Sequence, residues 1–477
     1  MNYVFYDFET SGLDTKFDQP IQIAAILVDD NFNVIDDPIN EVCRLKDGVI
    51  PNPSALVVTK VDINILKNGQ SFYEMMTNIH DKFSKWSPAT FIGYNSIRFD
   101  EEVLRSSFFQ SLYDPYLTNT NSNTRTDLFK IVLGSAALKI NILKFPINDK
   151  NNRISFKLEN IARANGINVE QAHDALSDVE TTIAIAKIIK DNDPEYWNEC
   201  MKIMTPNTLM TYLENGKYHF AAPEHVASNS IMKPLSFLTC NPNNVKELAF
   251  FDLNYDVNKY SDYRSSAIVS MIESKQRIVK TLQSNKSPII LNSDFIEARE
   301  IFTKDDLTMF EERHKDISDN QNFIENLDQA LVDRFDDYQL SWSQPSFLEE
   351  QIYNGEFYSS DDKGKILNFR SCESPSKRYA ISKDLKDKRL REICYRILFA
   401  ESPDILPNNI LSDRKQFIAD KVFSTEEKVR WCTLEKAKND LESIKSSDRF
   451  IKDKEYIKKI EDFITSEEDR YKSYLIS

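Results

Sequence analysis

The stretch YVFYDFET at residues 3–10 is an apolar run that ends in two carboxylates. On a strand, side chains two positions apart face the same side, so Asp7 and Glu9 are predicted to project together while Phe8 packs behind them. Buried carboxylates are costly unless they are paired or bound to a metal. The apolar neighbours argue against two surface acids on an edge strand. The stretch therefore predicts a buried strand whose end carries an acidic site.

Further residues able to bind a metal or a proton occur downstream. Asp100 ends the stretch NSIRFD at residues 95–100, and AHDALSD at residues 172–178 contains His173 and Asp178. Taken singly, Asp100 is an ordinary acid at a helix start, His173 a structural residue and Asp178 a solvated first-turn acid. Taken with Asp7 and Glu9, they indicate a divalent-metal site of oxygen ligands with a base beside it. The combination predicts cleavage of phosphodiester bonds.

Length and composition indicate a globular chain of more than one domain. A chain of 477 residues with 30 Phe and 20 Tyr is long and apolar enough for two or three hydrophobic cores. It contains no apolar run of membrane-spanning length and no basic-then-apolar leader, so we expect a cytoplasmic protein without a membrane partner. Its six cysteines form no C-x-x-C pair, which argues against disulfides and a zinc site.

The net charge of −15 does not by itself favour a nucleic-acid partner. The charge is uneven, however, at about −5 over residues 1–190, about −12 over residues 191–370 and about +2 over residues 371–477. Because salt screens surface charges beyond about 10 Å, a local basic groove is compatible with an acidic whole. The net charge therefore leaves the partner open.

The patterning of the first third alternates between strand and helix and predicts an α/β domain over residues 1–194. The expected strands lie at residues 3–8, 22–28, 33–35 and 90–93, and the expected helices at residues 71–86, 100–109, 156–165 and 175–190. Gly166 is predicted to end the third of these helices. A polar loop of turn-forming residues is expected at 119–124.

The remainder divides into a β-containing part at residues 195–344 and a helical part at residues 345–477. In the first part we expect strands at residues 236–240, 249–252 and 287–291 and a helix at residues 265–282. In the second we expect amphipathic helices at residues 417–422, 426–431, 436–444, 456–464 and 471–475.

The motifs together resemble those of the DEDDh 3′→5′ exonucleases, and among these the chain is most similar to the bacterial exonuclease I family. The resemblance rests on DFETSGL at 7–13, GYNSIRFDEEV at 93–103, YDPY at 113–116, ANGI at 164–167, HDALSD at 173–178 and QIYNGEFY at 351–358. It implies an RNase H-like exonuclease domain at residues 1–194. It also implies an SH3-like middle domain at residues 195–344 and a C-terminal helical domain at residues 345–477.

The same resemblance implies an exodeoxyribonuclease that degrades single-stranded DNA from the 3′ end to 5′-mononucleotides, in DNA repair and recombination. Two Mg²⁺ ions, with Mn²⁺ as a substitute, are implied. Asp7 would bridge both ions, Glu9 and Asp178 would complete one site and Asp100 would hold the other. His173 would be the general base, since its ordinary pKa of about 6.5 lies close to working pH.

Contacts to the substrate are implied at four positions. Glu9 belongs to the site itself, and Lys157 stands where the family often has an arginine, which keeps the charge but loses the bidentate fork. Arg105 is a candidate phosphate contact and Tyr116 a candidate base stack. The alternatives are a solvated helix residue for Arg105 and a turn anchor for Tyr116.

The family also implies binding of single-stranded-DNA-binding protein, for which the basic C-terminal helices are the expected surface. A monomer is the default oligomeric state.

Three other interpretations remain open. An RNase-T-like or oligoribonuclease-like RNA exonuclease would use the same five residues, although such enzymes are much shorter. A catalytically silent nucleic-acid-binding protein would be expected to have lost part of the set. A proofreading subunit would need a polymerase-binding tail, whereas this C-terminal part is predicted to fold.

Overall fold

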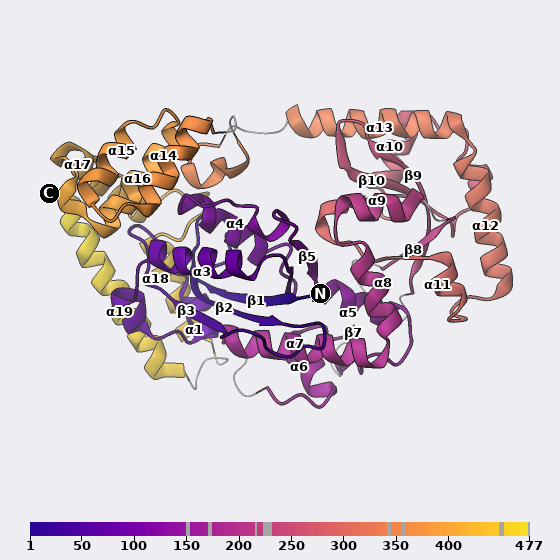
Figure 1. The fold of residues 1–477 in the computed structure, drawn as a ribbon, viewed down its shortest axis with the longest axis horizontal. Helices are drawn as coiled ribbons and strands as arrows, with labels where there is room; N and C mark the ends of the chain where they lie inside the picture. Colours follow the sequence, from indigo (N-terminus) through magenta and orange to yellow (C-terminus); the bar gives the residue numbers. More distant parts are fainter. Residues whose placement is uncertain are drawn as a thin grey trace.

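A computed structural model of the chain describes residues 1–148, 153–169, 174–214, 217–222, 231–340, 345–354, 358–447 and 453–475. These residues form two five-stranded sheets, a two-stranded sheet of β6 (Ile147–Asn148) and β7 (Arg153–Ile154), and a C-terminal group of helices. In Figure 1 the first sheet occupies the centre, the second sheet lies to its right, and the C-terminal helices lie to its left. His173 and residues 355–357 of the QIYNGEFY motif lie outside the described residues.

The first sheet is mixed and has the strand order β3-β2-β1-β4-β5. Its strands are β1 (Tyr3–Thr10), β2 (Pro20–Val28), β3 (Ile39–Val42), β4 (Thr90–Gly93) and β5 (Thr124–Asp127). Strand β1 runs antiparallel to β2 and parallel to β4, and β4 runs parallel to β5. The carboxyl ends of β1, β4 and β5 therefore meet at one edge of the sheet.

The two faces of β1 pack against different helices. Val4 and Tyr6 belong to a core shared with α3 (Phe72–Trp86) and α4 (Asp100–Gln110). Tyr3 and Phe5 belong to a core shared with α7 (Ala175–Asn192). Because strand side chains alternate, Asp7 and Glu9 continue the Tyr3 and Phe5 face and point towards α7.

The predicted helices of this region are present. The other helices are α1 (Pro53–Thr59), α2 (Ile63–Asn68), α5 (Leu128–Ala137) and α6 (Leu158–Ala164). Helix α3 begins after Ser71, whose side chain accepts a hydrogen bond from the Glu74 amide. Helix α6 ends before Gly166, which has a positive φ of 79° that favours glycine.

The second sheet has the strand order β11-β10-β9-β8-β12. The elements that follow α7 are α8 (Pro194–Lys202), α9 (Pro206–Glu214), β8 (His219–Ala221), β9 (Lys233–Asn241), β10 (Asn244–Asp252), α10 (Ser265–Glu273), β11 (Val279–Gln283), β12 (Ile290–Asn292), α11 (Ser293–Glu297), α12 (Lys304–Ser318) and α13 (Gln321–Leu340). The single helix expected at residues 265–282 is wrong in its second half. Residues from Val279 onward pair with β10 as a strand, after a turn at Arg277 with φ of 46°.

The C-terminal part is helical, as expected. Its elements are a 3-10 helix, η4 (Leu348–Tyr353), and the helices α14 (Ser360–Ser371), α15 (Pro375–Lys383), α16 (Lys388–Glu401), α17 (Asn408–Val422), α18 (Leu434–Lys445) and α19 (Lys454–Lys472). The helix expected at residues 426–431 is wrong, because these residues are irregular. Trp431 packs instead between Phe347, at 4.9 Å between ring centroids, and Phe17, at 5.3 Å.

The first sheet shares cores with both other parts. On one side, Trp197 of α8 lies 5.9 Å from Tyr3 and donates a hydrogen bond to its hydroxyl, so the core continues beyond residue 194. On the other side, Ile50, Leu56 and Leu66 pack with apolar residues of α16 to α19. Among the described residues, no helix combines the length and the apolar character needed to cross a membrane.

Candidate active site

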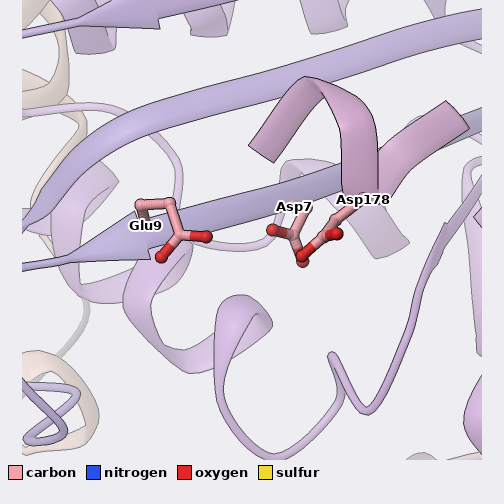
Figure 2. Close-up of side chains that lie close together, drawn as sticks. All are labelled: Asp7, Glu9 and Asp178. Carbon is pink, nitrogen blue, oxygen red and sulfur yellow. The ribbon is translucent and has the colours of Figure 1, made fainter. Parts of the chain in front are cut away.

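Three carboxylates meet at the carboxyl end of β1. One oxygen each from Asp7, Glu9 and Asp178 lies within 4.8 Å of the others. Figure 2 shows Asp7 and Glu9 extending from the same side of the strand, with Asp178 reaching them from the first turn of α7. The period of two along β1 brings the first pair together, and the packing of α7 on Tyr3 and Phe5 adds the third.

Asp100 comes to the same edge of the sheet from β4. It is buried at the start of α4, and the backbone amide of Phe8, between Asp7 and Glu9, donates a hydrogen bond to it. The chain reaches this position through a tight turn, in which Asn95 has a positive φ of 62°. Gly93 is required there, because a Cβ would lie 2.5 Å from that of Ser96. Asp100 is not one of the three closest carboxylates, but it lies beside them.

Burial raises the pKa of Asp7, Glu9 and Asp100, and repulsion from neighbouring acids adds to the effect. Burial comes first for Asp7, and Asp100, Glu9 and Asp178 raise its pKa further. Burial likewise raises the pKa of Glu9 to about 8, with Asp178 and Asp100 adding to the effect. Burial also raises the pKa of Asp100. Ionising these carboxyl groups together is therefore unfavourable.

The donor set fits divalent cations. Among the described residues, no lysine, arginine or histidine forms an ion pair with Asp7 or Glu9, although both carboxylates are largely shielded from water. Buried carboxylates without a counter-ion are stable only when a metal binds or a proton is taken up. Carboxylate oxygens are the ligands that Mg²⁺ and Mn²⁺ prefer. Asp7, Glu9 and Asp178, with Asp100 beside them, could hold such an ion.

His173 is the one predicted site residue that the described residues omit. Its neighbour Asp174 begins α7, and the Asp174 side chain accepts hydrogen bonds from the Ser177 amide at 3.1 Å and from Gln22 Nε2 at 3.0 Å. Gln22 is the strand partner of Glu9 across β1 and β2. The start of α7 is thus tied to the sheet beside Glu9.

Arg105 lies inside the protein and pairs with a buried acid. It is only 7 % exposed, and its Nε donates a hydrogen bond to Glu101 Oε1 at 2.8 Å. Arg125 donates to the same oxygen at 2.6 Å. Glu101 is fully buried, so the two arginines are its counter-ions. Arg105 is therefore not the solvated helix residue of the alternative, and its contact with a DNA phosphate stays a prediction.

Tyr116 and Lys157 lie nearer the surface. The ring of Tyr116 is covered on one face by Arg105, whose guanidinium carbon is 5.1 Å from the ring centroid, and its amide donates to Asp114 in a turn. Lys157 precedes α6 with a side chain that is 73 % exposed. It lies at a hollow of about 490 Å³ formed with Tyr94, Asn95 and Phe156. The substrate contacts of Glu9, Lys157 and Tyr116 stay predictions.

Sequence analysis missed two residues that hold Asp100 and α4 in place. Asp127 at the end of β5 accepts hydrogen bonds from the amides of Asn95, at 2.8 Å, and Ile97, at 3.3 Å, and so fixes the turn that leads to Asp100. Glu101 anchors α4 from the inside, as described above. Asp127 at a strand-to-helix junction was a readable signal, whereas the partners of Glu101 come from separate elements.

The comparison with known families defines the class of the N-terminal part. Residues 4–186 match the model of the RNase_T family, described as "Exonuclease". That range contains every residue of the predicted site from Asp7 to Asp178. The prediction that this chain is an exonuclease is therefore confirmed.

Comparisons over the whole chain are more particular. Exodeoxyribonuclease I of Buchnera aphidicola subsp. Schizaphis graminum is 28 % identical over 88 % of this chain and 86 % of its own length. The Escherichia coli K12 enzyme of that name is 27 % identical over 82 % of this chain and 84 % of its own. The predicted resemblance to bacterial exonuclease I is confirmed by these relatives.

Solved structures agree in fold. The structure of E. coli exonuclease I in complex with a dT13 oligonucleotide is 23 % identical and has a TM-score of 0.82 over 98 % of this chain and 99 % of that chain. The structure titled "ExoI/SSB-Ct complex" is also 23 % identical, with a TM-score of 0.80 over the same shares of the two chains. The predicted fold class is confirmed by this likeness, which covers the exonuclease part, the middle sheet and the C-terminal helices.

Proposed function

We propose that this protein is a 3′→5′ exodeoxyribonuclease that removes 5′-mononucleotides from single-stranded DNA by metal-dependent hydrolysis. The observation that carries the proposal is the cluster of Asp7, Glu9 and Asp178, whose oxygens lie within 4.8 Å of one another in an exonuclease domain. Relatives named exodeoxyribonuclease I that match most of the chain support the choice of DNA. A role in DNA repair and recombination is part of the same proposal.

The four acids have separate parts in the proposed reaction. Asp7, Glu9 and Asp178 would hold one divalent ion, Mg²⁺ or Mn²⁺ in its place, and Asp100 would help to hold a second. When bound, such ions lower the pKa of a water and stabilise the leaving 3′ oxygen. Asp127 would act as a positioning residue, because it holds the turn from which Asp100 projects.

His173 is proposed as the general base. It immediately precedes Asp174, which the structure places at the start of α7 and which contributes to the raised pKa of Glu9. A neutral imidazole at that position takes the proton of the attacking water, which a protonated lysine or arginine does not do.

The strand would approach through the hollow beside Lys157. Tyr94, Phe129 and Phe156 line it with aromatic surface, and Asn95 connects it to the turn before Asp100. Aromatic rings stack on bases of any sequence, and an exposed lysine contacts phosphate as a point charge. Single-stranded-DNA-binding protein is a proposed partner, with the basic helices of the C-terminal part as its surface, because the fold also occurs in the "ExoI/SSB-Ct complex".

The test is digestion of end-labelled single-stranded DNA, double-stranded DNA and single-stranded RNA of one sequence. Each is incubated with Mg²⁺ or with EDTA, using the natural protein and Asp7→Ala. We expect mononucleotides from the 3′ end of single-stranded DNA only, with Mg²⁺ only, and none from Asp7→Ala. Asp37→Ala, which removes an exposed acid in the segment before β3, serves as the matched control and should keep full activity.

Each alternative has its own result in this experiment. A preference for RNA keeps the acidic site and assigns a ribonuclease. Activity retained in Asp7→Ala contradicts the site assignment. No cleavage of any substrate, with DNA binding intact, indicates a binding protein in an exonuclease fold.

A further inference from the structure

A second charged region lies where the exonuclease domain meets the C-terminal helices, away from the acidic cluster. It is a cavity of about 460 Å³ between the segment that follows β3 and the helices α16, α17 and α19. In Figure 1 these elements meet at the left of the molecule. Seven lysines and arginines line the cavity, against four carboxylates. An excess of cations at this depth is unexpected in a chain whose net charge is −15.

Three of the cations are balanced by the lining carboxylates. Arg396 pairs with Glu349 at 2.8 Å, and Arg44 pairs with Glu401 at 3.8 Å. Arg470 pairs with both Asp47 and Glu467. These pairs account for all four carboxylates and leave the other cations without a partner among the lining acids.

Of the four remaining cations, Lys67 is exposed and donates to Ser466 at 2.7 Å, and the other three are incompletely satisfied. Within the part of the chain that the structure describes, Lys421 forms no ion pair or hydrogen bond through its ammonium, which lies 5.6 Å from the ring centroids of Phe17 and Trp431. Lys46 donates only to the neutral Gln110, at 2.7 Å. Arg414 reaches the already paired Glu392 at 3.5 Å, and its Nε is buried without a partner.

The pKa values of the cavity residues agree with this excess of cations over carboxylates. Burial lowers the pKa of Lys46 to about 7 and the pKa of Lys421 to about 8, although Glu349 opposes both changes. Burial would raise the pKa of Glu349, but Arg396 and Lys421 outweigh it and bring the value to about 2. Glu349 therefore stays ionised, and one of its oxygens, Oε2, is buried without a partner.

We propose that this cavity binds a small molecule that carries a phosphate group. Lys421, Lys46 and Arg414 would contact the phosphate, because buried cations without counter-ions are stabilised by an anion that brings charge and acceptors together. The free oxygen of Glu349 would accept from a hydroxyl or amine of the ligand. Phe72 and Phe417 in the walls offer surface to an aromatic ring. The volume is that of a small-molecule site, and a nucleoside monophosphate or free phosphate are the two sources of this chemistry.

The site is independent of the acidic cluster and does not rest on the proposed function. The ligand would bind the exonuclease domain and the C-terminal helices at once, since Lys46 belongs to the former and Lys421 to the latter. A ligand that binds the folded protein raises its thermal midpoint by mass action. Binding is therefore measurable without any nuclease substrate.

The test is calorimetric titration and thermal unfolding of the full chain in EDTA, which keeps metal from the acidic cluster. The probes are dTMP, inorganic phosphate and thymidine at matched ionic strength. We expect dTMP to bind and to raise Tm, and Lys421→Met to weaken its binding about tenfold or more, as the loss of a charged hydrogen bond does. Lys438→Met, a surface lysine paired with Glu468, should bind as the natural protein does.

The outcomes separate the sources of the ligand. Equal binding of phosphate and dTMP assigns the phosphate group alone, and binding of dTMP only assigns a nucleotide; both support the site. Equal binding of thymidine and dTMP, an unchanged affinity in Lys421→Met, or no binding of any probe overturns it. Lys421→Met should fold, because an apolar side chain of similar shape replaces an unpaired buried charge. Arg414→Met repeats the test from a second cation.

Discussion

Asp100 and Glu101 are neighbours on α4 that show two ways of burying an acid. Both are buried, yet burial raises the pKa of Asp100, whereas Arg125 and Arg105 outweigh burial and lower the pKa of Glu101. Asp100 lies beside Asp7 and Glu9, which form no ion pair with a basic side chain among the described residues, and Glu101 belongs to a complete network of hydrogen bonds. Depth alone therefore does not mark a functional site.

The difference between the two regions lies in what is left for a ligand. Glu101 accepts from Arg105, Arg125, Thr118 and Tyr6, at 2.6 to 3.2 Å, so both of its oxygens are occupied by the protein. The charged groups closest in effect to Asp7 and Glu9 are other acids, and an additional cation would relieve the repulsion between them. The cavity around Lys421 shows the same feature with the opposite charge, because there the cations lack a complete set of partners in the protein.

The most severe test of this comparison is Glu9→Gln, which keeps the shape and removes one charge. Cleavage of single-stranded DNA should fall by about 10³-fold, the loss expected when a metal is held incorrectly. In EDTA, however, the variant should unfold at a higher temperature, because repulsion with Asp178 and Asp100 disappears. Turnover assays and thermal unfolding check both parts. A variant that is slower and also less stable in EDTA would mean that Glu9 is structural.

Glu101→Gln should have the opposite effect on folding. Removing the charge leaves Arg105 and Arg125 buried without their counter-ion, which destabilises a protein by about 3–5 kcal/mol. Urea denaturation with Mg²⁺ absent measures the change. Glu102→Gln is the matched control, since its pairs with Lys16 at 3.5 Å and Lys286 at 3.2 Å are longer and more open to water. If both variants lose equal stability, the buried Glu101 network stabilises the fold no more than the more exposed ion pairs of Glu102 do.

The sequence predicted the members of the acidic site better than their surroundings. Asp7 and Glu9 could be placed because a strand has a period of two, and Asp178 because the helix at residues 175–190 had a clear pattern. Their partners depend on topology. The pairing of β1 with β4 brings Asp100 to Phe8, and no local pattern states that pairing.

The errors have one physical cause, which is packing against distant segments. The pattern of residues 265–282 is continuous, but Val279 is taken into the sheet by β10. Residues 426–431 have helical spacing, but Trp431 packs on Phe17 and Phe347 instead. The alternative of a solvated Arg105 is wrong because Arg105 pairs with Glu101, whose second arginine, Arg125, comes from β5, 20 residues further along the chain. Such contacts override local propensity.

The stability of the metal-free protein should depend on pH through the acidic site. The pKa of Glu9 is raised from 4.5 to about 8 by burial and by Asp178, so its contribution is fully present below about 4.5 and is lost as pH rises through about 8. Mg²⁺ should therefore raise Tm more at about pH 9 than at about pH 6, since the ligands must be deprotonated. Differential scanning calorimetry with Mg²⁺ or EDTA measures this. The dependence should be weaker in Glu9→Gln, and an unchanged one would place the titration elsewhere.

The smallest expected effect concerns the hollow beside Lys157, where a cation is exposed rather than buried. Lys157→Ala should raise KM for single-stranded DNA about threefold to fivefold and leave kcat almost unchanged, since one exposed charge contributes at most about 1 kcal/mol. The slope of log KM against log salt should decrease by about one. Lys157→Arg should lower KM, because the guanidinium donates two hydrogen bonds to one phosphate. Lys187→Ala, an exposed lysine of α7 that pairs with Asp191, is the control. If Lys187→Ala changes KM as much as Lys157→Ala does, the strand is attracted by surface charge in general, and the hollow has no separate role.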